Sequence, residues 1–294
     1  MNDRQRSGDH GMTLPVLPEI VAQKYQRLRE ILATWNSVLV AFSGGVDSTL
    51  LLRVASEVLP GEVCAVYEDS PLNPVREGEA ARRLAEDLGV PLRVVTSESD
   101  DPRLTRNDRD RCYWCKHGLF SRLVSIAADG GFQQVVEGSN VDDLSDYRPG
   151  RRALQELNIP SPLLMAGLSK GEIRTLALAL ELPNWNKPAQ ACLASRIPYE
   201  TSITPELLRQ VETAEEVLRE MGFSRYRVRH HGAVARIEVD QSEFFRILDD
   251  KIRESIVEGI RRAGYSYVTL DLAGYRTGSM NAVLFNAISS ENEI

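Results

Sequence analysis

The sequence lacks any apolar run of the roughly 18 residues that a membrane-spanning helix requires. Its first residues, MNDRQRSGDHGM, are polar and lack the apolar stretch of a secretory signal peptide. We therefore expect a cytoplasmic protein with no membrane partner and with a disordered N-terminus over residues 1–18.

Basic charge and cysteine are also scarce. The 294 residues include 35 Lys and Arg against 42 Asp and Glu, which gives a net charge of −7. This acidic balance argues against a nucleic-acid partner, which usually requires a strongly basic surface. Four cysteines occur. In a cytosolic chain of this size, a Cys-x-x-Cys pair is more often metal-binding or redox-active than a structural disulfide.

Two common nucleotide-binding signatures are missing, namely G-x-x-x-x-G-K-[ST] and G-x-G-x-x-G. In their place stands VLVAFSGGVDST, from Val38 to Thr49. Its apolar first half predicts a buried parallel strand, and the leucine-rich stretch after the turn predicts a helix. Such a joint presents backbone N–H groups and the positive end of a helix, so we predict that it binds phosphate. The binding residues would be Ser43, Gly44, Gly45, Val46, Asp47 and Ser48.

Asp47 is unexpected beside an anion. Its carboxylate is explained if it holds a divalent cation that bridges the phosphates, or if it caps the helix that follows. A glycine-rich turn without a ligand is the alternative interpretation of the whole motif.

Apolar strands alternate with helices in the first half of the chain. Strands are predicted at 38–42, 63–67, 92–96 and 134–137, and a helix at 19–35. A second helix should be capped by Asn73, begin at Pro74 and stop at Gly89. This alternation predicts an α/β fold with a doubly wound parallel sheet. Because ligands bind beyond the carboxyl ends of such strands, residues 43–48, 68–70, 97–111 and 138–143 should surround one crevice.

The second half has a different pattern. Ser169 and Glu172 form a capping box that should open a helix to about Leu182. Residues 183–204 are proline-rich and without periodicity, and loops of that length are usually functional. The order then becomes helix 205–222, strands 225–229 and 233–239, helix 242–262 and strand 265–272, without a parallel-sheet pattern. We expect a nucleotide-binding domain at 19–185, a loop with Cys192 at 186–203 and a smaller α+β domain at 204–294.

Cys112 and Cys115 should lie at the start of a helix after the third strand, beside Arg109, Arg111 and Lys116. Such an environment predicts lowered thiol pKa values. One Cys-x-x-Cys pair cannot close a metal site, and Cys192 in the long loop is the obvious third ligand. Three thiolates suit an iron–sulfur cluster with one iron open, whereas structural zinc prefers four ligands. A redox dithiol or a chance spacing remains the alternative, and Cys64, in mid-strand, is expected in the core.

Two further motifs carry polar groups. Gly138 and Asn140, after the fourth strand, could contact the nucleotide, and Asp142 is a candidate magnesium ligand, although the motif could be a simple turn. Arg227 and Arg229 alternate on one strand and could bind phosphate or carboxylate, unless they form a solvated strand face. His230 and His231 are not spaced as a helical metal pair and are expected at the surface or in a turn. Glu215 and Glu238 could support a cation or pair with the arginines.

The motifs SGGVDS, RCYWCK, EGSNVDD, ACLASRIPY and RVRHHG follow one another in this order. The first resembles the pyrophosphate-binding loop of the PP-loop ATPases. The whole set resembles the LarE family, ATP-dependent sulfur transferases that build the nickel-pincer nucleotide cofactor of lactate racemase. The resemblance extends from about Glu19 to Met280.

The resemblance implies a reaction. ATP, with Mg²⁺, would activate a carboxylate of the small-molecule substrate pyridinium-3,5-biscarboxylic acid mononucleotide as an acyl-adenylate. Pyrophosphate would leave, stabilised by the phosphate loop and the metal. Sulfur would then displace AMP and give a thiocarboxylate.

The resemblance also assigns roles. Family members with one cysteine, matching Cys192, give up its sulfur and form dehydroalanine, whereas three-cysteine members are thought to bind a 4Fe–4S cluster that carries a sulfide. Cys112, Cys115 and Cys192 therefore predict the cluster type. Asp47, Cys192, Ser195 and Arg196 would be catalytic, and Trp114, Arg227 and Arg229 would bind the substrate. A sulfide donor and a homo-oligomer, specifically a hexamer, are implied as partners.

Three other functions are consistent with parts of the sequence. An iron–sulfur-dependent tRNA thiolase also combines a PP-loop with three cluster cysteines, but the acidic charge argues against it. An ammonia-using ligase would not need the three cysteines. A non-catalytic nucleotide-binding module would release no pyrophosphate.

Overall fold

The computed structural model describes residues 17–97, 101–144 and 149–276. The disorder expected over residues 1–18 falls outside this part of the chain, except for Leu17 and Pro18, which lead into the first helix. Among the described residues, no helix is both long and apolar enough to cross a membrane.

The first unit alternates strands and helices as predicted. Its strands are β1 (Val38–Ala41), β2 (Val63–Asp69), β3 (Leu92–Thr96) and β4 (Gln134–Val136). Its helices are α1 (Glu19–Leu32), α2 (Val46–Val58), α3 (Val75–Asp87), α4 (Pro102–Thr105), α5 (Arg111–Gly130), α6 (Gly150–Glu156), α7 (Pro162–Met165) and α8 (Lys170–Ala179), with a 3-10 turn η1 at Val141–Leu144.

The strands of this unit pair in parallel, in the order β3-β2-β1-β4 within the described chain. Val38 of β1 faces Val63 of β2 on one side and Gln134 of β4 on the other. The chain thus moves outward from β1 to β3 and then returns to the opposite side of β1. Ligands of doubly wound sheets bind at such a switch point, outside the carboxyl ends of the strands. The predicted PP-loop-type α/β fold is confirmed.

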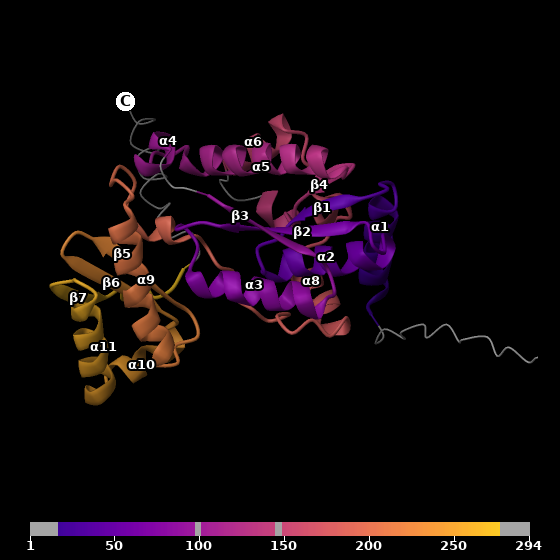
Figure 1. Cartoon of the computed structure of the whole chain (residues 1–294). Helices are drawn as coiled ribbons and strands as arrows, with labels where there is room; N and C mark the ends of the chain where they lie inside the picture. The colour runs from indigo at the N-terminus through magenta and orange to yellow at the C-terminus, as the bar shows by residue number, and fades with distance from the viewer. Residues whose placement is uncertain (1–16, 98–100, 145–148, 277–294) are drawn as a thin grey trace, which may run out of the picture.

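Helices cover both faces of this sheet (Figure 1). On one face, Phe120 and Leu123 of α5 and Leu154 of α6 pack against Leu39 and Val135 of the sheet. On the other face, α1, α2, α3 and α8 bury the larger core. Burial on both faces explains why the central strand β1 is a continuous apolar run, whereas the edge strand β3 is largely open to solvent and contains Arg93.

The second unit is a small α+β domain. Its strands are β5 (Tyr226–His231), β6 (Val234–Val239) and β7 (Tyr267–Leu270), and its helices are α9 (Pro205–Glu220), α10 (Phe244–Ile247) and α11 (Asp250–Arg262), with 3-10 turns η2 (Leu193–Arg196) before it and η3 (Gln241–Glu243) within it. It has its own core, in which Leu218 of α9 and Ile256 of α11 pack with Val228 and Ile237 of the sheet. Figure 1 shows this unit beside the first, with α9 on the side that faces the first unit.

Two predicted helix features are wrong. Asn73 does not cap α3, because its side-chain amide donates to the carbonyl of Glu68 (3.2 Å), and Pro74 occupies the N-cap position. The helix predicted over 242–262 is broken after Ile247. The Asp249 carboxylate accepts the backbone N–H groups of Lys251 (3.0 Å) and Ile252 (3.1 Å) and so starts α11 as a separate helix.

The second sheet also contains a pairing that the sequence pattern did not predict. Strands β5 and β6 form an antiparallel hairpin, whereas β6 and β7 are parallel, with Val234 opposite Tyr267. A parallel pair needs a long crossover connection, and α10 and α11 supply it.

Candidate active site

A cavity of about 700 Å³ lies at the carboxyl ends of β1, β2 and β4. Its walls include the phosphate loop 43–48, the loop after β4, the start of α8 and the loop that carries Cys192. The crevice expected at the switch point of the sheet is therefore present, and it contains both the predicted nucleotide site and the thiol of the long loop.

The backbone of the phosphate loop requires glycine. Gly44 has a φ of 68°, and a Cβ at this position would lie 3.2 Å from both the Cα and the Cβ of Ala81 in α3. The hydroxyl of Ser48 lies 3.1 Å from that of Ser43 and accepts the Ser43 N–H (3.3 Å). α2 begins at Val46, so its positive N-terminal end faces the cavity.

Asp47 does not cap α2. Gly45 occupies the N-cap position, and the Asp47 carboxylate instead forms an ion pair with the ammonium of Lys170. Its other oxygen, Oδ1, is buried and has no hydrogen-bond partner among the described residues. Burial raises the pKa of Asp47, Lys170 opposes that rise, and the nearby charge of Asp143 adds to it. The helix-capping explanation for Asp47 is therefore wrong, and the cation that this carboxylate meets in the structure is Lys170.

The loop after β4 lies against the phosphate loop. A Cβ on Gly138 would lie 3.2 Å from the backbone nitrogen of Ser48, so glycine permits this approach. Asn140 is buried, and its side-chain oxygen accepts the Asp142 N–H (3.0 Å). Asp142 in turn accepts the backbone N–H of Lys170 (2.8 Å). Gly138, Asn140 and Asp142 all line the cavity, as expected for residues beside a nucleotide.

The three cysteines converge on one region. Cys115 and Cys192 both pack against a small apolar cluster made of Leu72, Leu193, Ala194, Ile197, Ile203, Leu208 and Val211. Cys112 is close enough to Cys192 for the charge of the Cys192 thiolate to help raise the pKa of Cys112. No group of His, Cys, Asp or Glu side chains within the described chain forms a ready-made metal site. As they stand, the three thiols therefore do not form a metal site.

The predicted lowering of the thiol pKa values is wrong for the α5 pair. Burial is the main cause that raises the pKa of Cys112, although part of this residue reaches the surface, and Arg111 opposes the rise. Burial also raises the pKa of Cys115, and the charges of Glu68 and of the other two thiolates add to it. Desolvation thus outweighs the basic neighbours. Cys64 is half-buried in β2, with its thiol 3.5 Å from the carbonyl oxygen of Ala65.

Asn107 and Arg111 join the start of α5 to the loop that carries Cys192. Asn107 is fully buried at a φ of 60°, and its amide donates to the carbonyls of Pro198 (2.7 Å) and Thr201 (3.0 Å). Arg111 is buried and donates to the carbonyl of Ala194 (3.1 Å). These bonds explain how Cys112 and Cys115 come to lie beside Cys192.

The Cys192 loop is attached at both ends. At its start, Asn184 and Lys187 donate to the carbonyl of Gly44 in the phosphate loop, at 3.1 and 3.2 Å. At its end, the fully buried Arg196 donates to the carbonyl of Cys192 (2.8 Å) and pairs with Glu215 (2.8 Å). In this arrangement Arg196 positions the loop, while Ser195 is half-buried next to it.

Arg227 and Arg229 are buried and do not form a solvated strand face. Arg227 donates to the carbonyl of Ala189 (3.2 Å) and lies over the ring of Tyr275. Arg229 donates to the carbonyl of Ser195 (2.9 Å) and pairs with Glu238 (2.8 Å). Burial, and then the positive charge of Arg196, lower the pKa of Arg227. Both guanidinium groups thus face the loop that carries Cys192.

Trp114 lies outside the cavity wall. Its ring stacks under the guanidinium of Arg103, 4.4 Å from the ring centre, and meets Tyr113 edge to face. His230 and His231 are the last residues of β5, not turn residues, and His230 lies 3.3 Å from the hydroxyl of Tyr265.

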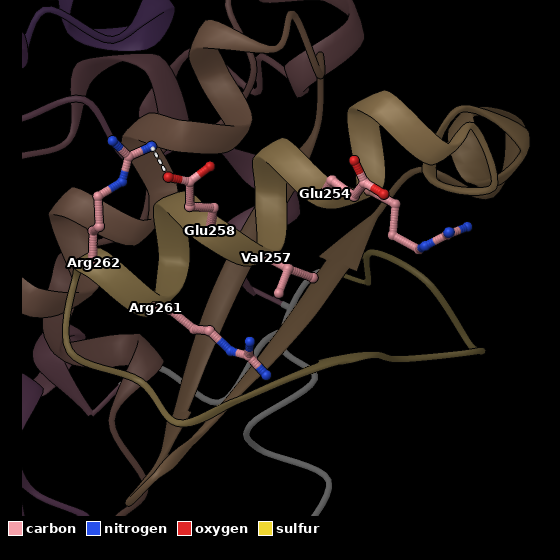
Figure 2. A pocket seen from close by; sticks show the side chains of 6 residues that line it. Glu254, Val257, Glu258, Arg261 and Arg262 are labelled. Carbon is pink, nitrogen blue, oxygen red and sulfur yellow. Dashed lines mark ion pairs between the residues drawn. The ribbon is translucent and has the colours of Figure 1, made fainter.

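A second hollow, of about 640 Å³, lies on α11 and is lined by side chains of this helix alone. Figure 2 shows that its labelled side chains all belong to this helix and that Glu258 faces Arg262, which is 3.8 Å away. Its lining is a charged helix face, so the candidate chemistry belongs to the crevice at the phosphate loop.

No family model matches the chain. It is similar to the pyridinium-3,5-bisthiocarboxylic acid mononucleotide synthase of Lactiplantibacillus plantarum, with 40% identity over 272 residues that cover 91% of this chain and 97% of that protein. The chain belongs to this family, the LarE family. It is also 40% identical, over 266 residues, to an uncharacterized protein of Synechocystis, with 90% of this chain and 99% of that protein covered. A GMP synthase of Aeropyrum pernix is 30% identical over 209 residues, which cover 62% of this chain and 39% of that enzyme.

Several crevice residues of this LarE-family chain carry no motif that the sequence makes visible. Lys170, Lys187 and Glu137 line the cavity in this way, whereas Glu68, which also lines it, lies in the segment 68–70 that was expected there. Glu137 is buried and accepts hydrogen bonds from Ser139 (2.8 Å) and Ser161. For Glu68, one signal was present, because charged residues directly after a buried strand usually face the ligand. The lysines are fixed by contacts with residues more than 100 positions away in the sequence.

Proposed function

We propose that this protein catalyses ATP-dependent sulfur transfer to a carboxylate of pyridinium-3,5-biscarboxylic acid mononucleotide. The observation that carries the proposal is that Cys192 lines the same cavity as the phosphate loop 43–48. A carboxylate activated there would form within reach of the thiol. Membership of the LarE family supports the choice of substrate.

The first step is adenylation. A carboxylate oxygen of the substrate attacks the α-phosphorus of ATP, and pyrophosphate leaves toward Ser43, Gly45 and Ser48. Backbone N–H groups and the N-terminus of α2 stabilise the departing charge. Asp47 and Asp142, which both line the cavity, would hold Mg²⁺, and the metal would supply further charge stabilisation.

The second step is sulfur transfer. A sulfur nucleophile attacks the activated carbonyl carbon, AMP leaves, and a thiocarboxylate remains. Arg196 and the loop attachments hold Cys192 at the crevice, and Ser195 follows on the same turn. We propose that Arg227 and Arg229 bind the substrate phosphate. To do so, they would give up their hydrogen bonds to the carbonyls of Ala189 and Ser195. Trp114, at the start of α5 beside Cys112 and Cys115, would also contact the substrate.

We further propose that Cys112, Cys115 and Cys192 hold a 4Fe–4S cluster, which would supply a renewable sulfide in place of a sacrificed thiol. The convergence of the three thiols supports this proposal, because three thiolates suit a cluster with one open iron. The corresponding units are a nucleotide domain at 19–185, a sulfur loop at 186–203 and a substrate domain at 204–294. A sulfide donor and a hexameric assembly remain predictions.

Anaerobic reconstitution with iron and sulfide tests the cluster. The wild-type protein should develop a thiolate-to-iron absorption band and release pyrophosphate when ATP and the mononucleotide are added. Cys112→Ala, Cys115→Ala and Cys192→Ala should each lose the band. Cys64→Ala, the matched control in β2, should retain it.

Mass spectrometry of Cys192 before and after one turnover distinguishes the cluster from the cysteine itself as the sulfur source. An unchanged Cys192 agrees with the cluster proposal. A colourless wild-type protein whose Cys192 becomes dehydroalanine would show instead that the cysteine itself is the sulfur source.

A further inference from the structure

We propose that Lys170 is a substitute cation at Asp47, which Mg²⁺ replaces only when it arrives with the phosphates of a nucleotide. Lys170 would then move from the carboxylate to those phosphates. This inference rests on the proposed use of ATP, but not on the sulfur chemistry. Lys170 would then be a positioning residue that admits the metal as a complex with the nucleotide and not as the free ion.

The position of Lys170 is fixed from two sides. It is the first residue of α8, and the capping box of Ser169 and Glu172 holds this helix start in place. Its backbone N–H donates to Asp142 (2.8 Å), while its ammonium reaches across to Asp47. A single residue thus connects the loop after β4 with the phosphate loop, the two segments that carry the candidate metal ligands.

The ammonium and a metal ion compete for one oxygen. Asp47 Oδ2 holds the ammonium, whereas Oδ1 is buried away from solvent. A metal ion that approaches from the cavity must therefore displace the lysine or force the carboxylate to rotate. The nearby charge of Asp143 helps to raise the pKa of Asp47, and the ammonium of Lys170 opposes that rise.

The lysine has a new partner available when it is displaced. Lys170 lines the same cavity as Ser43, Gly45 and Ser48, where the phosphates would bind. A lysine ammonium is a compact charge on a flexible stem and binds phosphate readily. Displacement by free metal alone would leave the ammonium without an anion, whereas displacement by a metal–nucleotide complex supplies one. The exchange therefore favours Mg·ATP over the free metal ion.

Mn²⁺ binding, measured by electron paramagnetic resonance without substrate or nucleotide, tests this inference. We expect wild-type protein to bind Mn²⁺ weakly and Lys170→Met to bind it about tenfold or more tightly, because one positive charge leaves the carboxylates. The same variant should bind ATP more weakly in the presence of Mg²⁺. The two affinities change in opposite directions, which a merely structural role would not produce.

Two further variants serve as controls. Lys170→Arg keeps the charge and should leave Mn²⁺ binding weak. Lys187→Met removes a positive charge from the same cavity, but that lysine pairs with Glu77 (2.7 Å) and not with Asp47, so Mn²⁺ affinity should stay near the wild-type value. Circular dichroism confirms that each variant is folded.

Equal Mn²⁺ affinity of wild type and Lys170→Met would overturn the inference, as would equal tightening by Lys187→Met. These results are independent of the proposed function. If the wild-type protein releases no pyrophosphate with the mononucleotide, the proposed reaction fails while the metal measurement retains its meaning.

Discussion

At the scale of single residues, the phosphate loop depends on Gly44. Its φ of 68° is a region that glycine enters without strain and most other residues enter only at a cost, and Ala81 leaves no space for a side chain. The positive φ and the contact with Ala81 both exclude a Cβ atom at this position. They hold the carbonyl of Gly44 toward Asn184 and Lys187, which connect the loop to the rest of the crevice.

We expect Gly44→Ala to lower the free energy of unfolding by about 2–3 kcal/mol and to weaken ATP binding at least tenfold. Gly89→Ala is the matched control, because Gly89 has a φ of 65° but open space around it. That variant should cost only about 1 kcal/mol and leave ATP binding unchanged. Thermal unfolding and calorimetric titration with ATP measure both effects. Equal losses in the two variants would show that the contact with Ala81 is unimportant.

At the scale of elements, the start of α5 is joined to the loop at 197–203 through Asn107. The bonds from its amide satisfy buried carbonyls that would otherwise lack partners. Its left-handed backbone is one that asparagine tolerates better than most residues. The placement of Cys112 and Cys115 beside Cys192 therefore depends on a residue that is not itself part of the chemistry.

Asn107→Ala should expose the Cys192 loop. We expect faster hydrogen exchange over residues 190–203 and loss of most of the iron after reconstitution, because the carbonyls of Pro198 and Thr201 lose their donor. Asn158→Ala is the control, since Asn158 has a similar φ of 52° but is exposed. Unchanged exchange in the Asn107 variant would contradict this role.

The elements also show what a sequence can predict. Apolar runs identified β1 to β4 because a strand buried on both faces must be apolar throughout. The capping box identified the start of α8 because its two partners are local. The break before α11 was missed because helical periodicity continues across Asp249. The ion pair of Lys170 with Asp47, and the bonds of Asn107, join distant segments and leave no local pattern.

At the scale of the whole molecule, the apolar cluster around Leu208 joins the two units. It combines Leu72 from the loop after β2, the loop residues Leu193 and Ile197, and Val211 of α9. Cys115 and Cys192 pack on the same cluster. The relative position of the units and the meeting of the thiols therefore have a common cause.

Leu208→Ala should lower the free energy of unfolding by about 2–5 kcal/mol and reduce iron retention, because the cavity loosens the packing under the thiols. ATP binding should stay within about twofold of the wild type. Leu163→Ala, in the core of the first unit, is equally buried and should lose similar stability. Iron retention is measured at a temperature well below the melting temperature of each variant. If Leu163→Ala then loses as much iron as Leu208→Ala, the cluster around Leu208 has no special part in holding the thiols.

The double attachment of the Cys192 loop constrains its length. The chain between Asn184 and Arg196 is held at the phosphate loop by one end and at Glu215 by the other. An insertion or deletion there would detach one end, whereas a substitution of Cys192 would not. The side chain presented to the crevice at this position can therefore be exchanged while the loop keeps its path.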